Sequence, residues 1–196
     1  MTLKPILKFA HTLLEEALQP GDTAVDCTMG NGHDTLFLAN LVGEAGHVFA
    51  FDIQQAALEN TQNLLAQHGF VGRDDPAHRF TLIQNSHANL KDHIPAKVHQ
   101  NIKAAIFNLG YLPGGDKTIC TTPHSTMRAI ETLIPMLATN GIIILVAYPG
   151  HPEGEHETVQ ILDYCKNLPR DTVNIIEYKI LNNPNKPPLV IAIEKL

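Results

Sequence analysis

Two hydrophobic patterns alternate along the chain. Apolar residues at helical spacing predict amphipathic helices, whereas short, continuously apolar runs predict strands buried on both faces, as in a parallel sheet. The expected helices cover roughly residues 4–18, 34–41, 55–68, 125–137 and 158–168, with a short helix that ends near residue 93. The expected strands cover residues 23–27, 47–52, 80–83, 104–107, 141–147, 173–181 and 189–194, and residues 69–78 are expected to form a loop.

The order of these elements predicts an α/β fold. Strands alternate with helices until the last two strands, which are joined by residues 182–188 with no helix between them and should therefore be antiparallel neighbours. We expect a mostly parallel seven-stranded sheet with one reversed strand. A length of 196 residues with 44% hydrophobic content fits a single domain over residues 1–196, with the helix within residues 1–20 packed on it.

Composition narrows the class of protein. The net charge of −6, from 14 basic and 20 acidic residues, argues against a nonspecific nucleic-acid coat but allows a local basic face for a structured RNA. Three distant cysteines without a Cys-x-x-Cys motif indicate neither a disulfide framework nor a zinc ribbon. The absence of a long apolar run and of a signal-peptide pattern predicts a cytoplasmic protein with no membrane partner.

The segment Val25–Asp34 carries the first candidate chemistry. A buried strand runs into Gly30-Asn31-Gly32 and then opens a helix. Glycines allow a sharp turn and a close ligand approach, and the helix start offers unpaired N–H groups with partial positive charge. Asp26, at the end of the strand, adds a hydrogen-bond acceptor. This pattern predicts a nucleotide-type pocket.

Asp52 extends that prediction. It ends the second strand 22 residues after Gly30, a separation that suits a carboxylate on ribose hydroxyls. Thr35 stands where a dinucleotide fingerprint has its third glycine, so the NAD pattern fails. Ribose recognition is common to NAD and S-adenosylmethionine sites, so Asp52 does not choose between these cofactors.

The acid before the glycine turn is the pattern of class I methyltransferases. Together with Asp52–Gln54, Asn108–Lys117 and Tyr148–Gly154, it resembles the bacterial YtqB/MnmM family over essentially the whole chain. The resemblance implies a Rossmann-like class I methyltransferase fold, with strand order 3-2-1-4-5-7-6, the last strand antiparallel and helices on both faces. It also implies an S-adenosylmethionine-dependent tRNA N-methyltransferase that binds the anticodon stem-loop. The implied acceptor is the aminomethyl nitrogen of 5-aminomethyl-(2-thio)uridine at the wobble position, and the product is 5-methylaminomethyl-(2-thio)uridine.

Two alternatives stay open. One is an S-adenosylmethionine-dependent methyltransferase of rRNA or a small molecule; the other is a non-catalytic module that binds S-adenosylmethionine or RNA. The complete Asn108–Lys117 loop favours catalysis, because a binding module needs no loop that aims an amine. A homodimer is compatible with a compact enzyme that needs more tRNA-contacting surface, although the sequence identifies no interface.

The expected cofactor site follows from the converging strand ends. Asn31, Gly32 and His33 are expected at the methionine end, Asp52 at the ribose, Gln54 at its rim, and Ser86 with His87 at the adenine edge. The full expected set of cofactor-binding residues is Asp26, Gly30, Asn31, Gly32, His33, Asp52, Gln54, Ser86, His87 and Asn108.

Asn108-Leu109-Gly110-Tyr111 occupies the place of the Asn-Pro-Pro-Tyr loop of amino-group methyltransferases. In that loop an amide oxygen and a backbone carbonyl accept hydrogen bonds from the target amine, and the aromatic ring stacks on the base. Leu109 and Gly110 replace the two prolines, so this loop is expected to be less rigid. Asp116, counted with Asn108 and Tyr111 as catalytic, or His151 would take the amine proton.

The RNA-binding surface is expected to include charged and loop residues near the same edge. The candidates are Gly110, Tyr111, Lys117, Arg128, His151 and Lys186; ordinary surface charge is the alternative for the three basic ones. His151 and His156 lack the i, i+4 spacing of a helical zinc pair, so no metal is expected.

Overall fold

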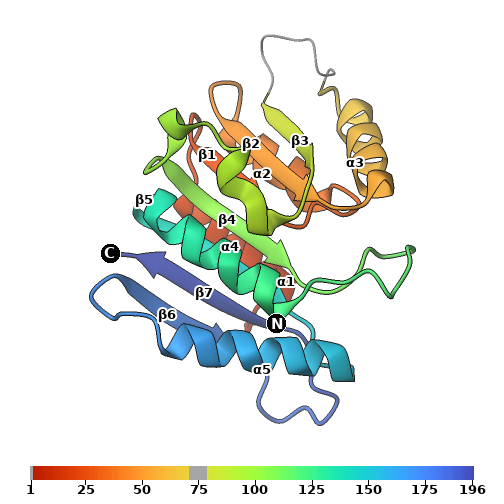
Figure 1. Cartoon of the computed structure of the whole chain (residues 1–196), viewed down its shortest axis with the longest axis vertical. Helices are drawn as coiled ribbons and strands as arrows, with labels where there is room; N and C mark the ends of the chain where they lie inside the picture. The colour runs from red at the N-terminus through yellow and green to blue at the C-terminus, as the bar shows by residue number, and fades with distance from the viewer. Residues whose placement is uncertain (1, 71–78) are drawn as a thin grey trace.

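The computed structural model describes residues 2–70 and 79–196. Most of the loop expected over residues 69–78 lies outside these ranges. Helices and strands alternate along the chain as the periodicity predicts (Figure 1). The elements are α1 (Ile6–Ala17), β1 (Thr23–Asp26), α2 (His33–Val42), β2 (His47–Asp52), α3 (Gln55–Gln67), β3 (Phe80–Gln84), the 3₁₀ helices η1 (His87–Asp92) and η2 (Ala96–Val98), β4 (Ile102–Asn108), α4 (Pro123–Met136), β5 (Leu137–Ala147), α5 (Pro152–Lys166), β6 (Val173–Tyr178) and β7 (Leu189–Lys195).

The strands form one sheet in the order β3-β2-β1-β4-β5-β7-β6. The first five strands are parallel, and β7 runs antiparallel to both β5 and β6. The expected order and the single reversed strand are therefore confirmed. The strand order reverses direction between β1 and β4, which is where open α/β sheets bind their ligands.

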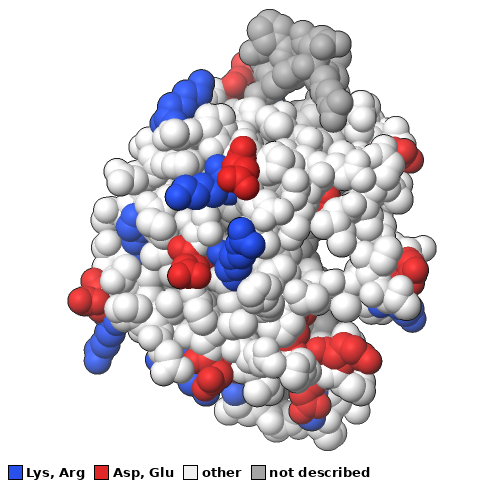
Figure 2. Space-filling view, viewed as in Figure 1, with Lys and Arg blue, Asp and Glu red and all other residues white. Residues whose placement is uncertain are grey.

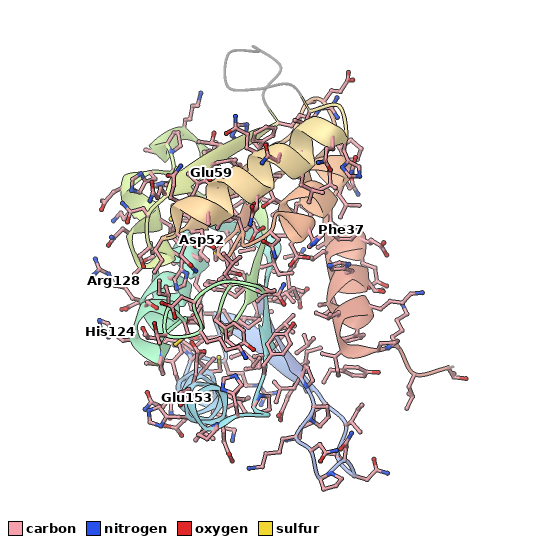
Figure 3. All side chains as sticks on the ribbon, turned by 90° about the vertical axis from the view of Figure 1, so that its right-hand side faces the viewer. Phe37, Asp52, Glu59, His124, Arg128 and Glu153 are labelled. Atoms are coloured by element: carbon pink, nitrogen blue, oxygen red, sulfur yellow. The ribbon has the colours of Figure 1, made fainter. Side chains whose placement is uncertain are left out.

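Helices cover both faces of this sheet, as Figures 1 and 3 show from two directions. One hydrophobic cluster joins the sheet to α4, α5 and η1, and another joins it to α1, α2 and α3. The central strands contribute to both clusters: Val25 and Phe107 point into the first, Ala24 and Ile106 into the second. Continuous apolar character in the strands thus reflects burial on both faces.

Several boundaries differ from the predicted ones. Helix α5 begins at Pro152, six residues before the expected start, because proline suits the first helical turn and the His151 ring nitrogen Nδ1 accepts a hydrogen bond from the Gly154 N–H at 3.1 Å. Strand β5 begins directly after α4, at Leu137, and β6 ends at Tyr178. Helix η2 was not expected.

Helix α1 links the start of the chain to its end. It packs against β5 and β7, and its Phe9 ring stacks on Tyr178 of β6 with 4.1 Å between ring centroids. The Tyr178 hydroxyl donates a hydrogen bond to the Lys4 carbonyl at 2.9 Å. This docking carries His11 to the edge of the sheet where the parallel strands end.

Candidate active site

A cavity of about 800 Å³ opens at the carboxyl ends of the parallel strands. Figure 3 looks onto this edge, with Asp52 near the centre and the segment that follows β4 looping across the front. Residues after β1, β2, β3 and β4 line the cavity, together with Leu7 and His11 of α1. Its volume lies within the range of about 300–1,000 Å³ that is usual for small-molecule and cofactor sites.

The glycine turn forms one wall of the cavity. Gly30 and Gly32 have φ of +50° and +85°, a region that favours glycine. Gly32 is buried beneath α3: a Cβ at this position would lie 2.8 Å from the Thr61 Cα atom. Its lack of a side chain therefore serves close packing of the turn against α3, while Gly30, Asn31 and His33 line the cavity.

Asp52 ties the ends of β1 and β2 together. Its Oδ2 accepts a hydrogen bond from the Gly30 N–H at 3.1 Å, and its Oδ1 accepts one from the Gln54 N–H at 3.0 Å. Each carboxylate oxygen has a further lone pair, and both Asp52 and Gln54 line the cavity. This arrangement suits a carboxylate that holds a ribose diol.

Asn31 connects the glycine turn to the opposite wall. Its Nδ2 donates to the Pro113 carbonyl at 3.2 Å, and its Oδ1 accepts from Asn60 at 2.9 Å. The turn and the segment after β4 therefore hold each other across the cavity.

The segment after β3 supplies the third wall. Ser86 caps η1 by accepting a hydrogen bond from the Ala88 N–H. The His87 ring hydrogen-bonds the Cys27 carbonyl at 2.9 Å and the Ser125 hydroxyl at 3.2 Å, and burial lowers its pKa. His87 is thus a neutral, fully partnered ring in the cavity lining and not a solvated histidine.

The segment after β4 is anchored from behind by a buried acid. The Thr121 hydroxyl accepts a hydrogen bond from the Gly110 N–H and donates one to Glu157 of α5, both at 2.8 Å. Glu157 is 5% exposed, and burial raises its pKa. Tyr111 and Cys120 form an isolated β-bridge next to this anchor. The segment is therefore held in place without the two prolines of the Asn-Pro-Pro-Tyr loop.

Tyr111 lies at the mouth of the cavity, where its side chain is exposed. The Lys117 ammonium lies 5.5 Å from the Tyr111 ring centroid, and the His151 ring lies 6.4 Å from it. All three side chains line the cavity. They form an aromatic and basic rim of the kind that receives a nucleobase and its phosphates.

Asp26 does not occupy the position expected for it. The carboxylate is buried below the cavity floor, where it accepts hydrogen bonds from the Thr35 hydroxyl at 2.6 Å and the Thr28 N–H at 3.1 Å. Burial, and then the charge of Asp34, raises its pKa to about 7. Asp26 therefore braces the turn from beneath, because the strand aims its side chain toward α2 and away from the cavity.

Gly32, which is buried beneath α3, also lies outside the cavity lining, and so do three further expected residues. The Asp116 carboxylate is exposed and accepts hydrogen bonds from the backbone and hydroxyl of Thr118. Arg128 is exposed on α4, which Figure 3 places to one side of the opening. Lys186 pairs with Glu155 beside a shallow second pocket. The structure brings none of the three side chains to the cavity.

Two residues that the sequence interpretation left unassigned meet inside the cavity. His11 Nε2 lies 2.7 Å from Asp34 Oδ1, and the Asn108 amide donates a hydrogen bond to Asp34 Oδ2. The Tyr148 hydroxyl donates to Asn108 Oδ1 at 3.1 Å. Asp34 was visible as an acid in the first turn of the helix, but its link to a histidine 23 residues earlier had no local signal.

Charge is distributed without a dominant basic region on the face shown in Figure 2, where basic and acidic side chains are intermingled. No group of three or more metal-ligating side chains is arranged to hold an ion within residues 2–70 and 79–196. None of the helices described in those ranges combines the length and apolar character needed to cross a bilayer.

The sheet order and a cavity built from a glycine turn, Asp52 and an asparagine at the end of β4 define a class I S-adenosylmethionine-dependent methyltransferase. Residues 48–194 match the family model described as "Putative rRNA methylase", and the chain belongs to this family.

The similarity to known proteins covers nearly the whole chain. An Arabidopsis thaliana protein, "tRNA (mnm(5)s(2)U34)-methyltransferase, chloroplastic", is 34% identical over 98% of this chain and 70% of its own length. The structure of a "putative rRNA-methylase" from Clostridium thermocellum is 38% identical, with a TM-score of 0.92 and full coverage of both chains. The structure of a "putative methyltransferase" from Streptococcus mutans in complex with SAH is 33% identical, with a TM-score of 0.86 and full coverage of both chains.

Proposed function

We propose that the protein is a tRNA methyltransferase acting on the wobble uridine. The methyl group would pass from S-adenosylmethionine to the aminomethyl nitrogen of 5-aminomethyl-(2-thio)uridine and give the 5-methylaminomethyl nucleoside. The observation that carries the proposal is that one cavity has a cofactor wall, with the glycine turn and Asp52, facing an acceptor wall, with Asn108 and Tyr111. The identity of the nucleoside comes from the printed activity of the Arabidopsis relative.

The cofactor wall fits S-adenosylmethionine, which supplies an electrophilic methyl group carried on a sulfonium sulfur. Asp52 holds the ribose diol with the lone pairs that Gly30 and Gln54 leave available. Asn31 and His33 face the methionine end, with Gly30 and Gly32 shaping the turn, and Ser86 with His87 borders the adenine.

The acceptor wall orients the amine. Asn108 Oδ1 accepts one hydrogen bond from Tyr148 and keeps a second lone pair for the substrate nitrogen. Tyr111 stacks on the uracil ring. Methyl transfer is an in-line displacement, so holding the acceptor nitrogen in line with the methyl group supplies much of the rate enhancement.

The RNA backbone would meet the rim. Lys117 and His151 lie at the cavity mouth, with Gly110 beside them, and Lys186 lies farther out in the loop between β6 and β7. These residues would contact the anticodon stem-loop in the cytoplasm, where tRNA is modified. A second copy of the chain would enlarge this surface, so we include a homodimer in the proposal.

Nucleoside mass spectrometry tests the function directly. tRNA from a strain lacking the gene should accumulate the unmethylated aminomethyl nucleoside, and the wild-type gene should restore the methylated one. Asn108→Ala should fail to restore it, whereas Asn174→Ala, on the exposed side of β6, should succeed. An unchanged tRNA profile with a methyl group missing from rRNA would replace tRNA by rRNA as substrate.

A further inference from the structure

A connected set of polar side chains lies at the acceptor wall of the cavity. It consists of His11, Asp34, Asn108 and Tyr148, all of which line the cavity. His11 Nε2 and Asp34 Oδ1 are 2.7 Å apart, Asn108 donates to Asp34 Oδ2, and Tyr148 donates to Asn108 Oδ1. The Asn108 N–H also donates to the Thr28 hydroxyl at 2.7 Å. The Asn108 amide is thus fixed with its oxygen toward Tyr148 and its nitrogen toward Asp34.

Asp34 is the acid closest to the acceptor position. Among the described residues that line the cavity, Asp34 and Asp52 are the carboxylates, and Asp52 is occupied with the backbone at the end of β2. The Asp34 side chain is 14% exposed, and each of its oxygens has lone-pair capacity beyond its present partner. It shares Asn108 with the acceptor wall, so an amine held by Asn108 lies within reach of Asp34.

His11 holds Asp34 in place, and the charge of the His11 ring affects how strongly Asp34 attracts a proton. Its ring stacks on Phe37 with centroids 4.1 Å apart, which holds Nε2 toward Asp34, and Figure 3 labels Phe37 where α2 meets α1. The side chain is 35% exposed, so the ring can exchange its proton with water. The hydrogen bond to Asp34 raises the His11 pKa, against the lowering effect of burial, and the charges of Asp34 and Glu15 raise it further.

We propose that Asp34 is the catalytic carboxylate that removes the proton from the substrate ammonium group, and that His11 positions Asp34 by donating its Nε2–H to the carboxylate. The inference rests on the proposed function. The ammonium N–H bond breaks as Asp34 takes the proton, and the electron pair stays on nitrogen. Asp34 keeps this proton, while neutral His11 donates its Nε2–H to Asp34 Oδ1 and holds the carboxyl group in place. The lone pair then forms the N–CH₃ bond while the electron pair of the S–CH₃ bond remains on sulfur, and Asp34 afterwards releases its proton to solvent.

Other candidate bases are less suited. Asp116 lies outside the cavity, and His87 has both ring nitrogens engaged. His151 Nδ1 accepts the α5 capping hydrogen bond and lies near Glu153. Asp34 is therefore the favourably placed acceptor of the proton.

The decisive comparison pairs single-turnover rates with cofactor affinity. Asp34→Asn keeps both contacts, because the amide oxygen accepts from Asn108 and the amide nitrogen donates to His11 Nε2 when the neutral ring carries its proton on Nδ1. We expect methylation of tRNA bearing the unmethylated nucleoside to fall by about 100-fold or more, the usual scale for a lost general base. The dissociation constant for S-adenosylmethionine, measured by calorimetry, should stay nearly unchanged. A parallel loss of cofactor affinity would overturn the inference and make Asp34 a ligand of the methionine ammonium.

The pH profile tests His11. The rate should rise with pH as His11 becomes neutral, because a charged imidazolium beside Asp34 makes the carboxylate a weaker base. His11→Gln should remove or displace this acid limb. If the acid limb of the pH profile instead reflects titration of the substrate amine, it will persist in His11→Gln, and that result would overturn the role of His11. The other groups facing the pair are Glu15 on the same helix, Tyr148 after β5 and buried Asp26. Asp26→Asn is the matched control, since Asp26 has a pKa of about 7 without lining the cavity, and the limb should persist in it.

The proposed function and the assignment of Asp34 as the base can be refuted separately. If the wild-type protein methylates no tRNA, the proposed function is wrong. If the wild type methylates tRNA and Asp34→Asn does so equally fast, the function stands and the assignment of Asp34 is wrong. NMR titration of the His11 ring adds a readout that is independent of turnover: its pKa should fall in Asp34→Asn, because the hydrogen bond and charge that raise it are lost.

Discussion

Replacing Gly32 by alanine should destabilise the fold through two separable effects. Gly32 precedes α2 with φ of +85°, a conformation that a residue with a Cβ adopts at a cost of about 1–2 kcal/mol. The added Cβ would also lie 2.8 Å from the Thr61 Cα and 3.0 Å from its Cγ2 and Oγ1 atoms. Since the nearest of these atoms belongs to the backbone, trimming the Thr61 side chain would not relieve the contact.

The magnitude follows from adding the two effects. Overpacking a filled site costs about 1–3 kcal/mol. Together with the backbone strain, Gly32→Ala should lower the free energy of unfolding by about 2–5 kcal/mol. Gly69→Ala is the matched control: Gly69 has φ of +82°, and a Cβ there would meet no atom of residues 2–70 and 79–196 within 4 Å. Only the strain of about 1–2 kcal/mol applies to it.

Urea unfolding followed by circular dichroism measures both variants against the wild type. The difference between Gly32→Ala and Gly69→Ala isolates the contact with α3, and we expect about 1–3 kcal/mol. Equal destabilisation of the two variants would refute the argument that Gly32 exists to let the turn approach α3. A stable Gly32→Ala protein with normal cofactor affinity would refute it as well.

Three further predictions concern the site. Asp52→Ala should weaken S-adenosylmethionine binding by about 1–3 kcal/mol in calorimetry, because the ribose hydroxyls lose their acceptor; unchanged affinity would remove Asp52 from the site. Glu157→Gln should gain stability relative to the wild type as the pH rises. Burial raises the Glu157 pKa, so the stability that wild-type Glu157 contributes in its protonated form is complete below the ordinary carboxyl pKa and is lost as the pH rises through the raised pKa. If the difference in the free energy of unfolding between the two proteins, measured with urea, were the same at pH 4.5 and pH 7.5, this prediction would be wrong. Methylation of tRNA should slow as salt is added if Lys117 and its neighbours contact phosphates, and a flat response would favour a small-molecule substrate.

The sheet was predictable because its strands are buried on both faces. Runs such as His47–Asp52 are continuously apolar and leave little choice of structure, and the short link before β7 requires an antiparallel neighbour. The start of α5 was missed because its first turn, with Pro152 and several acidic residues, carries no apolar periodicity. What begins the helix is a cap by His151, which becomes visible only in three dimensions.

The site was predictable where the chain itself brings residues together. Strand ends place Asp52 and Asn108 on one edge, and the structure has both in the cavity. The pattern of hydrophobic and polar residues does not say toward which side a carboxylate at the end of a strand points. Asp26 was therefore expected in the cavity, whereas the structure places it beneath the cavity floor. The pairing of His11 with Asp34 depends on how α1 docks on the sheet, and the local hydrophobic periodicity does not predict this docking.

The docking of α1 also affects how the protein is made. This helix is synthesised before the strands on which it rests, β5 and β7, and before its partner Tyr178. Contacts between segments so distant in sequence form late in folding. A nascent chain can therefore fold the cofactor wall early, whereas His11 reaches Asp34 only after the C-terminal strands have been synthesised. Competence for methyl transfer would then appear only after β7 has been synthesised, so an incomplete translation product would retain a partial cofactor pocket but not the full acceptor wall.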